Sequence, residues 1–126
     1  MEMIIGGAYQ GKNAYAVKEH SEIVFQRGAD LDEKALLKAE GVLGFQDYIR
    51  KELKEGRSLL DLAEKIIEQN PNIVIVSEEV GYGVVPVDAF DRVYREAVGR
   101  ICTKLAAYSR KVTRVICGIG TVIKDA

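Results

Sequence analysis

Residues 6–13 have the types and the spacing of a loop that binds phosphate. Glycines let such a loop curl so that its backbone N–H groups point at phosphate oxygens, and a lysine adds a positive charge near the β and γ phosphates. The pattern G-x-x-x-x-G-K describes this arrangement, and the sequence fits it. The residues expected to bind a nucleotide are Gly6, Gly7, Ala8, Tyr9, Gln10, Gly11, Lys12 and Asn13. The alternative is that the glycines only serve a tight turn between a strand and a helix.

Asn13 departs from the pattern, because Ser or Thr is expected after the lysine. The hydroxyl of Ser or Thr would ligate Mg²⁺. The amide oxygen of Asn13 can approach the metal from a longer side chain, without the geometry of a hydroxyl. We therefore expect ATP or GTP with Mg²⁺ as the ligand, with Lys12 as a catalytic residue and Asn13 as a weakened metal ligand.

Two carboxylates, Glu78 and Glu79, follow the aliphatic run at residues 73–76. Residues directly after a buried parallel strand stand at the carboxyl edge of the sheet, where ligands bind in doubly wound folds. One carboxylate could hold a magnesium-bound water or orient a substrate hydroxyl, and we assign this catalytic and metal-binding role to Glu79. The alternative is that both are solvated charges at the end of a strand.

The elements around these residues predict an α/β fold. A strand at residues 3–5 precedes the glycine loop, and a helix without breakers follows from residue 13. The run at 73–76 is aliphatic on both faces, as expected of a central parallel strand. Further elements are a strand at 22–25, helices from Asp30 (paired with Glu33 as a capping box), at 45–53, at 58–67 and at 90–108, and a strand at 112–117. This alternation predicts a three-layer sandwich with a mainly parallel sheet, similar to a P-loop NTPase.

Composition narrows the functional classes. A chain of 126 residues without a linker predicts a single nucleotide-binding domain, residues 1–126. The net charge of −1, with both signs interspersed, argues against a nucleic-acid-binding protein. The longest aliphatic run has four residues, far short of the ~20 that span a bilayer, so we expect a cytoplasmic protein without a membrane partner. Cys102 and Cys117 lack the spacing of a zinc site.

Three single features have ordinary structural interpretations. His20 falls near the end of the first helix, where a surface histidine is expected rather than a nucleophile. Phe90, Tyr94 and Ile101 have the helical spacing of core residues. Gly99, inside the same helix, costs roughly 1 kcal/mol relative to alanine, which suggests close packing against another element.

Residues 79–86, Glu-Val-Gly-Tyr-Gly-Val-Val-Pro, resemble the E-V-G-x-G-x-V-P segment of the adenosylcobinamide kinase and adenosylcobinamide-phosphate guanylyltransferase family. The likeness continues through residues 92–106, which are similar to that family's long helix, and through 117–124, which are similar to its C-terminal strand and tail. The glycine loop is also similar to the family's G-G-x-x-x-G-K-S. Residues 19–71 show almost no likeness.

The resemblance implies a cobalamin-biosynthesis enzyme that phosphorylates the aminopropanol arm of adenosylcobinamide and then transfers GMP onto the phosphate. It also implies that Gly81, Tyr82 and Gly83 contact the corrinoid substrate, and that the protein is a homo-oligomer, a trimer. The family's GMP-carrying histidine has no counterpart here, so we predict that the guanylyltransferase half is lost. We also expect that the family's middle strand and its acidic residue are lost, since the pattern at residues 29–54 indicates helices. The alternative is a nucleotide- or corrinoid-binding relative without turnover.

Overall fold

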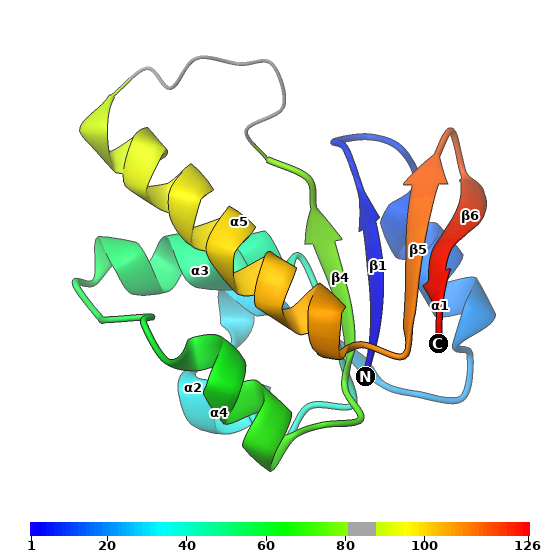
Figure 1. Ribbon diagram of the computed structural model, residues 1–126, viewed down its shortest axis with the longest axis horizontal. Helices are drawn as coiled ribbons and strands as arrows, with labels where there is room; N and C mark the ends of the chain where they lie inside the picture. The colour runs from blue at the N-terminus through cyan, green and yellow to red at the C-terminus, as the bar shows by residue number, and fades with distance from the viewer. Residues whose placement is uncertain (81–87) are drawn as a thin grey trace.

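The computed structural model describes residues 1–80 and 88–126, which form a six-stranded sheet flanked by helices (Figure 1). Helices α3, α4 and α5 lie in front of the sheet in this view, and α1 lies behind it. The elements are β1 (Glu2–Gly6), α1 (Lys12–Glu19), β2 (Phe25–Arg27), the 3₁₀ turn η1 (Gly28–Asp30), α2 (Glu33–Leu36), β3 (Gly41–Leu43), α3 (Phe45–Lys54), α4 (Leu62–Gln69), β4 (Val74–Glu78), α5 (Ala89–Tyr108), β5 (Lys111–Ile116) and β6 (Ile119–Asp125).

The strand order is β2-β3-β4-β1-β5-β6, and neighbouring strands are parallel except for the β5–β6 hairpin. This confirms the predicted α/β fold with a mainly parallel sheet. The central strand β1 lies between β4 and β5, with Gly6 in register with Glu78. Because parallel strands end at the same edge, the loop after β1 and the carboxylates after β4 lie at one edge of the sheet.

The core has two parts, one on each face of the sheet. The larger part packs side chains of α3, α4 and α5 against the sheet and includes Tyr94 and Ile101, as predicted, while Phe90 is partly buried at its margin. The smaller part lies under α1 and includes Ile4, Ala16 and Val76. These two apolar layers hold the strand ends in fixed positions, because they bury both faces of the central strands.

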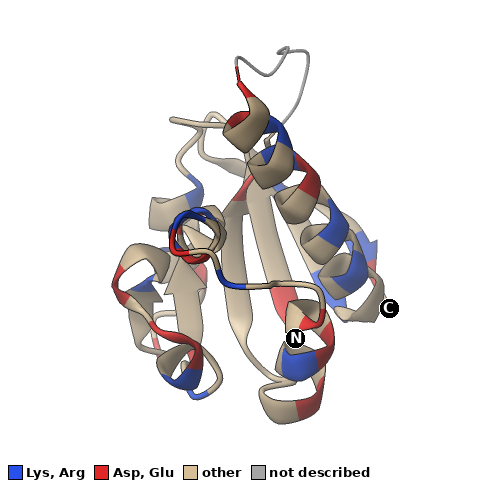
Figure 2. Cartoon of the chain, turned by 90° about the vertical axis from the view of Figure 1, so that its left-hand side faces the viewer, with Lys and Arg blue, Asp and Glu red and all other residues tan. Residues whose placement is uncertain are grey.

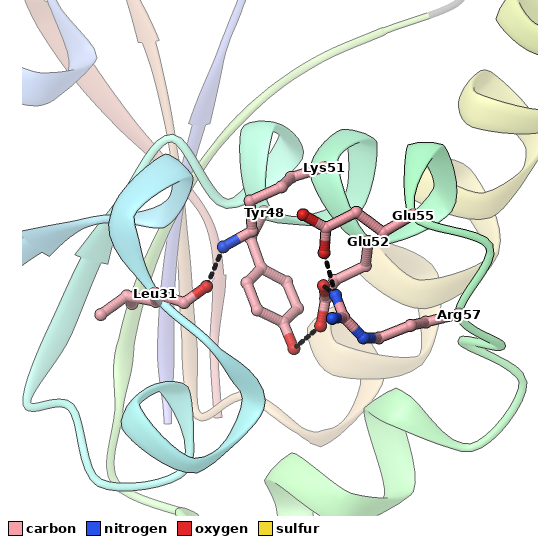
Figure 3. Close-up of polar contacts among 6 residues, drawn as sticks. All are labelled: Leu31, Tyr48, Lys51, Glu52, Glu55 and Arg57. Carbon is pink, nitrogen blue, oxygen red and sulfur yellow. Dashed lines mark hydrogen bonds and ion pairs between the residues drawn. The ribbon is translucent and has the colours of Figure 1, made fainter.

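A buried polar network fixes helix α3, which carries part of the site described below (Figure 3). The hydroxyl of Tyr48 donates to Glu52 Oε1 at 3.1 Å, and the other oxygen of Glu52 pairs with Arg57 at 2.5 Å. Lys51 donates to the carbonyl of Leu31. Burial, with the adjacent Glu52 charge, raises the pKa of Tyr48 far above its usual value, so its hydroxyl stays a donor.

Four predictions of local structure need correction. The second strand covers Phe25–Arg27 rather than 22–25, and the cap of the next helix is Asp32, whose Oδ1 accepts from Ala35 N, rather than Asp30. Residues 29–54 are not all helical, because β3 runs through Gly41–Leu43. The pattern predicted no strand after residue 117, but Ile119–Asp125 form the edge strand β6, which pairs antiparallel with β5.

The helices carry both signs of charge on their solvent side. Figure 2 shows Lys and Arg interspersed with Asp and Glu along them, and the pairs include Arg95 with Asp91 at 2.8 Å and Lys104 with Glu64 at 2.7 Å. Among the helices that the structure describes, none is long and apolar enough to cross a membrane.

Candidate functional site

The glycine loop connects β1 to α1 in the form expected of an anion-binding loop. Tyr9 and Gly11 have positive φ, 61° and 84°, which turns the chain back toward the start of α1. Within the described part of the chain, none of the backbone N–H groups of residues 8–13 donates a hydrogen bond to another atom of the protein. Unpaired N–H groups ahead of a helix N-terminus form a ready binding site for phosphate oxygens.

Lys12 and Gly6 complete the loop. The ammonium group of Lys12 donates to the carbonyl of Gly7 at 3.2 Å, so the side chain folds over the loop that it would serve. A Cβ on Gly6 would lie 2.7 Å from the carbonyl oxygen of Val115, so only glycine fits where the loop leaves the sheet. The lysine charge and the free N–H groups therefore face one small region.

A polar pocket of about 210 Å³ lies beside this loop. It is bounded by the start of α1, the ends of β2 and β3 and the first turn of α3, and its lining residues are Lys12, Asn13, Arg27, Ala29, Leu43, Gly44, Gln46 and Asp47. Gly44 has φ +70°, and a Cβ there would lie 2.9 Å from Asp47 Oδ2, so this glycine leaves room for the carboxylate. The pocket thus combines two cations, one carboxylate and the amide of Asn13.

Sequence reasoning missed Arg27, Gln46 and Asp47. Arg27 is the last residue of the three-residue strand β2, and Gln46 and Asp47 come shortly after the three-residue strand β3, which was not recognised. The available signal was the position of Asp47 shortly after an apolar segment that ends in glycine, which parallels the position of Glu79 directly after β4. Gln46 ties these two strand ends together, since its Oε1 accepts from Glu78 N at 2.9 Å and its side chain is buried.

Glu79 lies beside the loop, as predicted, and is engaged by a neighbour. Its backbone N–H donates to the carbonyl of Gly6 at 2.8 Å. Its two carboxylate oxygens accept from Arg114 Nε at 2.8 Å and Nη2 at 3.1 Å, a bidentate pair that fixes the side chain across the end of β1. Glu79 therefore lies at the edge of the candidate phosphate site with its charge compensated, whereas Asp47 shares a pocket with Lys12 and Asn13.

A second, larger hollow of about 500 Å³ lies between α5 and the sheet. Its walls are mostly apolar, and Glu78, Glu79 and Arg114 lie at its end beside the loop edge. Burial, followed by the charges of Asp47 and Glu78, raises the pKa of Tyr94 to about 12, so both carboxylates act on this phenol. Burial also raises the pKa of the Cys102 thiol, on the wall of this groove, to about 11.

Other predicted residues lie elsewhere. His20 pairs with Glu2 at 3.0 Å and Glu22 at 3.4 Å, and Glu2 starts β1, so His20 is at the edge of the sheet opposite to the loop. Gly81, Tyr82 and Gly83 fall outside the described residues. Gly99 does not pack closely against any element that the structure describes, because a Cβ placed on it meets none of the described atoms within 4 Å. That prediction is wrong, and Gly99 instead lines the larger groove.

The described residues include no group of three or more His, Cys, Asp or Glu side chains placed to hold a metal ion. Mg²⁺ needs fewer protein ligands than such a group, because in nucleotide sites it is bound by one or two carboxylates together with phosphates and waters. Asn13 and Asp47 line the same pocket as Lys12. These residues fit a magnesium ion that arrives with a nucleotide.

Comparison with known proteins identifies relatives of one kind. A family model described as cobinamide kinase / cobinamide phosphate guanyltransferase matches residues 32–123. The bifunctional adenosylcobalamin biosynthesis proteins CobU of Escherichia coli (strain K12) and Salmonella typhimurium (strain LT2) are each 42% identical to the chain over 52 residues. The match covers 41% of this chain and only 29% of either relative. The expectation that residues 19–71 show almost no likeness is wrong from residue 32 onward, whereas the phosphate loop lies before the matched range.

Proposed function

Because the chain belongs to the cobinamide kinase / cobinamide phosphate guanyltransferase family, we propose that it acts in cobalamin biosynthesis as a kinase that uses ATP or GTP to phosphorylate adenosylcobinamide. The observation that carries this proposal is that the N–H groups of residues 8–13 donate no hydrogen bond to the described residues. They lie under Lys12, at the edge of the sheet where Glu79 and Asp47 also lie. Phosphoryl transfer depends mostly on positioning and charge stabilisation, and this arrangement offers both.

Each part of the site has a separate task in this proposal. The N–H groups of residues 8–13 and the start of α1 bind the phosphates, and Lys12 leaves the Gly7 carbonyl to contact the β and γ phosphates. Glu79, fixed by Arg114 beside Gly6, orients the acceptor hydroxyl with the lone pairs that Arg114 does not use. Arg27 lies across the pocket from the loop and adds positive charge near the transferred group.

Magnesium, when bound with the nucleotide, neutralises charge on the β and γ phosphates. Asn13 and Asp47 would hold the magnesium ion, and Glu79 would contact it through a bound water. Asp47 supplies a carboxylate in the pocket where Asn13 replaces the usual hydroxyl. The site therefore keeps an anionic oxygen ligand despite its departure from the loop pattern.

We propose further that the guanylyltransferase half is absent. His20, the histidine of this chain, pairs with Glu2 at the opposite edge of the sheet, too far along β1 to attack a bound nucleotide. Asn13 also supports a second candidate function, a nucleotide- or corrinoid-binding relative without turnover, since the hydroxyl ligand of the pattern is missing.

The experiment that tests the kinase is transfer of label from γ-labelled ATP or GTP to adenosylcobinamide in the presence of Mg²⁺. The account predicts labelled adenosylcobinamide phosphate, with a higher rate for Asn13→Ser and loss of product for Lys12→Ala. Product equally formed by Lys12→Ala would contradict the assigned site. Nucleotide binding without labelled product, in the wild type and in Asn13→Ser alike, would favour the relative without turnover.

A further inference from the structure

The larger groove continues the edge that carries the phosphate loop. Its upper end is formed by Glu78, Glu79 and Val80, and Glu79 N donates to the Gly6 carbonyl at the start of the loop. From there the groove runs along the face of β1 and β5, with α5 as its other wall. Figure 1 shows α5 crossing the sheet obliquely, with β5 and β6 beside it rather than under it. A molecule in the groove would therefore have one end next to the phosphate site.

The walls of the groove are apolar along its length. The sheet contributes Met3, Ile5, Val112 and Ile123, and α5 contributes Val98 and Ala106. A volume of about 500 Å³ is within the usual range of small-molecule sites, which are lined mainly by apolar side chains with a few polar groups. The groove is thus suited to bind the apolar edge of a molecule, while the rest of that molecule stays in solvent.

Gly99 keeps the groove open. It lies in the middle of a helix of 20 residues, where glycine is unfavourable, and nothing in the described chain approaches within 4 Å of the position of its missing Cβ. Close packing inside the protein therefore does not account for this glycine. A ligand that approaches the backbone of α5 at this point would account for it.

Glu78 places a carboxylate at the end of the groove, which favours ligands with hydrogen-bond donors. The carboxylate of Glu79 is neutralised by Arg114, but among the described residues the carboxylate of Glu78 forms no hydrogen bond or ion pair. It is partly exposed at the end of the groove. An unpaired carboxylate at the end of an apolar groove attracts a molecule that presents hydroxyl or amide N–H donors there.

Together these observations lead us to infer that the groove between α5 and the β1–β5 face binds the phosphoryl acceptor, an amphipathic molecule with an apolar edge and a donor-bearing arm. This inference rests on the proposed kinase function. The arm lies against Glu78, beside Glu79 and the phosphate loop, and the apolar edge lies along α5 at Gly99. Gly99 determines the size of acceptor that fits, and Glu78 receives hydrogen bonds from its arm.

The test is equilibrium binding of cobinamide to the purified full chain, without nucleotide, followed by its absorbance or by calorimetry. The Gly99→Leu variant fills the groove with a residue that favours helix more than glycine does, so the fold should persist. Ala107→Leu is the matched control, because Ala107 is an exposed small residue of α5 outside the groove. We expect Gly99→Leu to weaken cobinamide binding at least 10-fold and to leave the Kd for GTP and ATP within 2-fold, while Ala107→Leu changes neither.

A second variant, Glu78→Gln, keeps the shape of the side chain and removes its charge. We expect about 3- to 10-fold weaker cobinamide binding and an unchanged Kd for nucleotide, because hydrogen bonds to a carboxylate are roughly twice as strong as those to an amide. Unchanged cobinamide affinity in Gly99→Leu, or wild-type protein that does not bind cobinamide, would overturn the inference. The kinase proposal would fail separately. In that case the wild type would transfer no label from the nucleotide, although Gly99→Leu would still weaken its binding of cobinamide.

Discussion

The side chain of Gln10 accepts a hydrogen bond from the backbone N–H of Cys117, with 2.7 Å between Oε1 and N, although the two residues are 107 positions apart. The backbone carbonyl of Gln10 also accepts from Gly118 N at 2.7 Å. Cys117 and Gly118 both have positive φ, 52° and 76°, which turns their N–H groups toward the loop. The turn between β5 and β6 therefore holds the glycine loop at residues 6–13 in its curled conformation.

We predict that Gln10→Ala weakens nucleotide binding about 3- to 10-fold, because it removes one bond of roughly 0.5–1.5 kcal/mol that preorganises the loop. Gln26→Ala, at an exposed position of β2, is the control. Titration calorimetry with GTP and ATP measures the effect. Equal affinities for Gln10→Ala and the wild type would show that the turn does not support the loop.

The position of Asp47 predicts a magnesium-specific effect. We expect Asp47→Asn to reduce the gain in nucleotide affinity that Mg²⁺ produces, while affinity measured in EDTA stays the same or rises, since a negative charge near the phosphates is removed. Asp125→Asn, at an exposed position of β6, serves for comparison. If Mg²⁺ increases the nucleotide affinity of both variants as much as that of the wild type, Asp47 is not a ligand of the metal.

Replacing Gly99 and replacing Gly56 with alanine should change the free energy of unfolding in opposite directions. Gly99 lies inside α5 with open space around it, so Gly99→Ala should raise the free energy of unfolding by about 0.5–1 kcal/mol. Gly56 has φ +77°, a conformation that costs an alanine roughly 1–2 kcal/mol, so Gly56→Ala should lower the free energy of unfolding. Urea denaturation measures both. A loss of stability in Gly99→Ala would mean that the space beside this helix is smaller than described.

Tyr94 should contribute to loss of stability in alkali. Its pKa is raised to about 12 in the folded protein, above the value of about 10 for an exposed tyrosine. Above pH 10 the unfolded chain loses this proton while the folded chain keeps it, so the free energy of unfolding falls by at most about 1.4 kcal/mol per pH unit until pH 12. The free energy of unfolding of Tyr94→Phe should decline less steeply between pH 10 and 12 than that of the wild type. Tyr108→Phe, at an exposed position, should follow the wild type, and identical slopes for all three would contradict the prediction.

The sequence predicted those elements whose signal is local. The loop at residues 6–13, the buried strand before Glu78 and the long helix to Tyr108 each have a pattern that leaves few alternatives, and the structure has all three. Strand β3 was not predicted because its three residues begin with Gly41, are followed by Gly44 and lie next to a segment with helical spacing. Its strand conformation comes from pairing with β2 and β4, which are distant in sequence.

The missed strand also explains the missed half of the site. Asp47 and Arg27 enter the pocket of Lys12 only because β2 and β3 end at the same edge as β1. Similarly, the pairing of Glu79 with Arg114 depends on β4 and β5 flanking β1, an order that local patterns do not specify. Gly99 was misjudged for the same reason, since the space beside a helix depends on the angle at which it crosses the sheet.

The most direct test of the account is thermal unfolding with GTP or ATP and Mg²⁺, with the wild type compared to Lys12→Ala. The account predicts that nucleotide at 100 times its Kd stabilises the wild type by about 2.7 kcal/mol, and that the same concentration stabilises Lys12→Ala far less. An unchanged Tm of the wild type with both nucleotides, or an equal increase in Tm for Lys12→Ala, would contradict the claim that residues 6–13 bind phosphate.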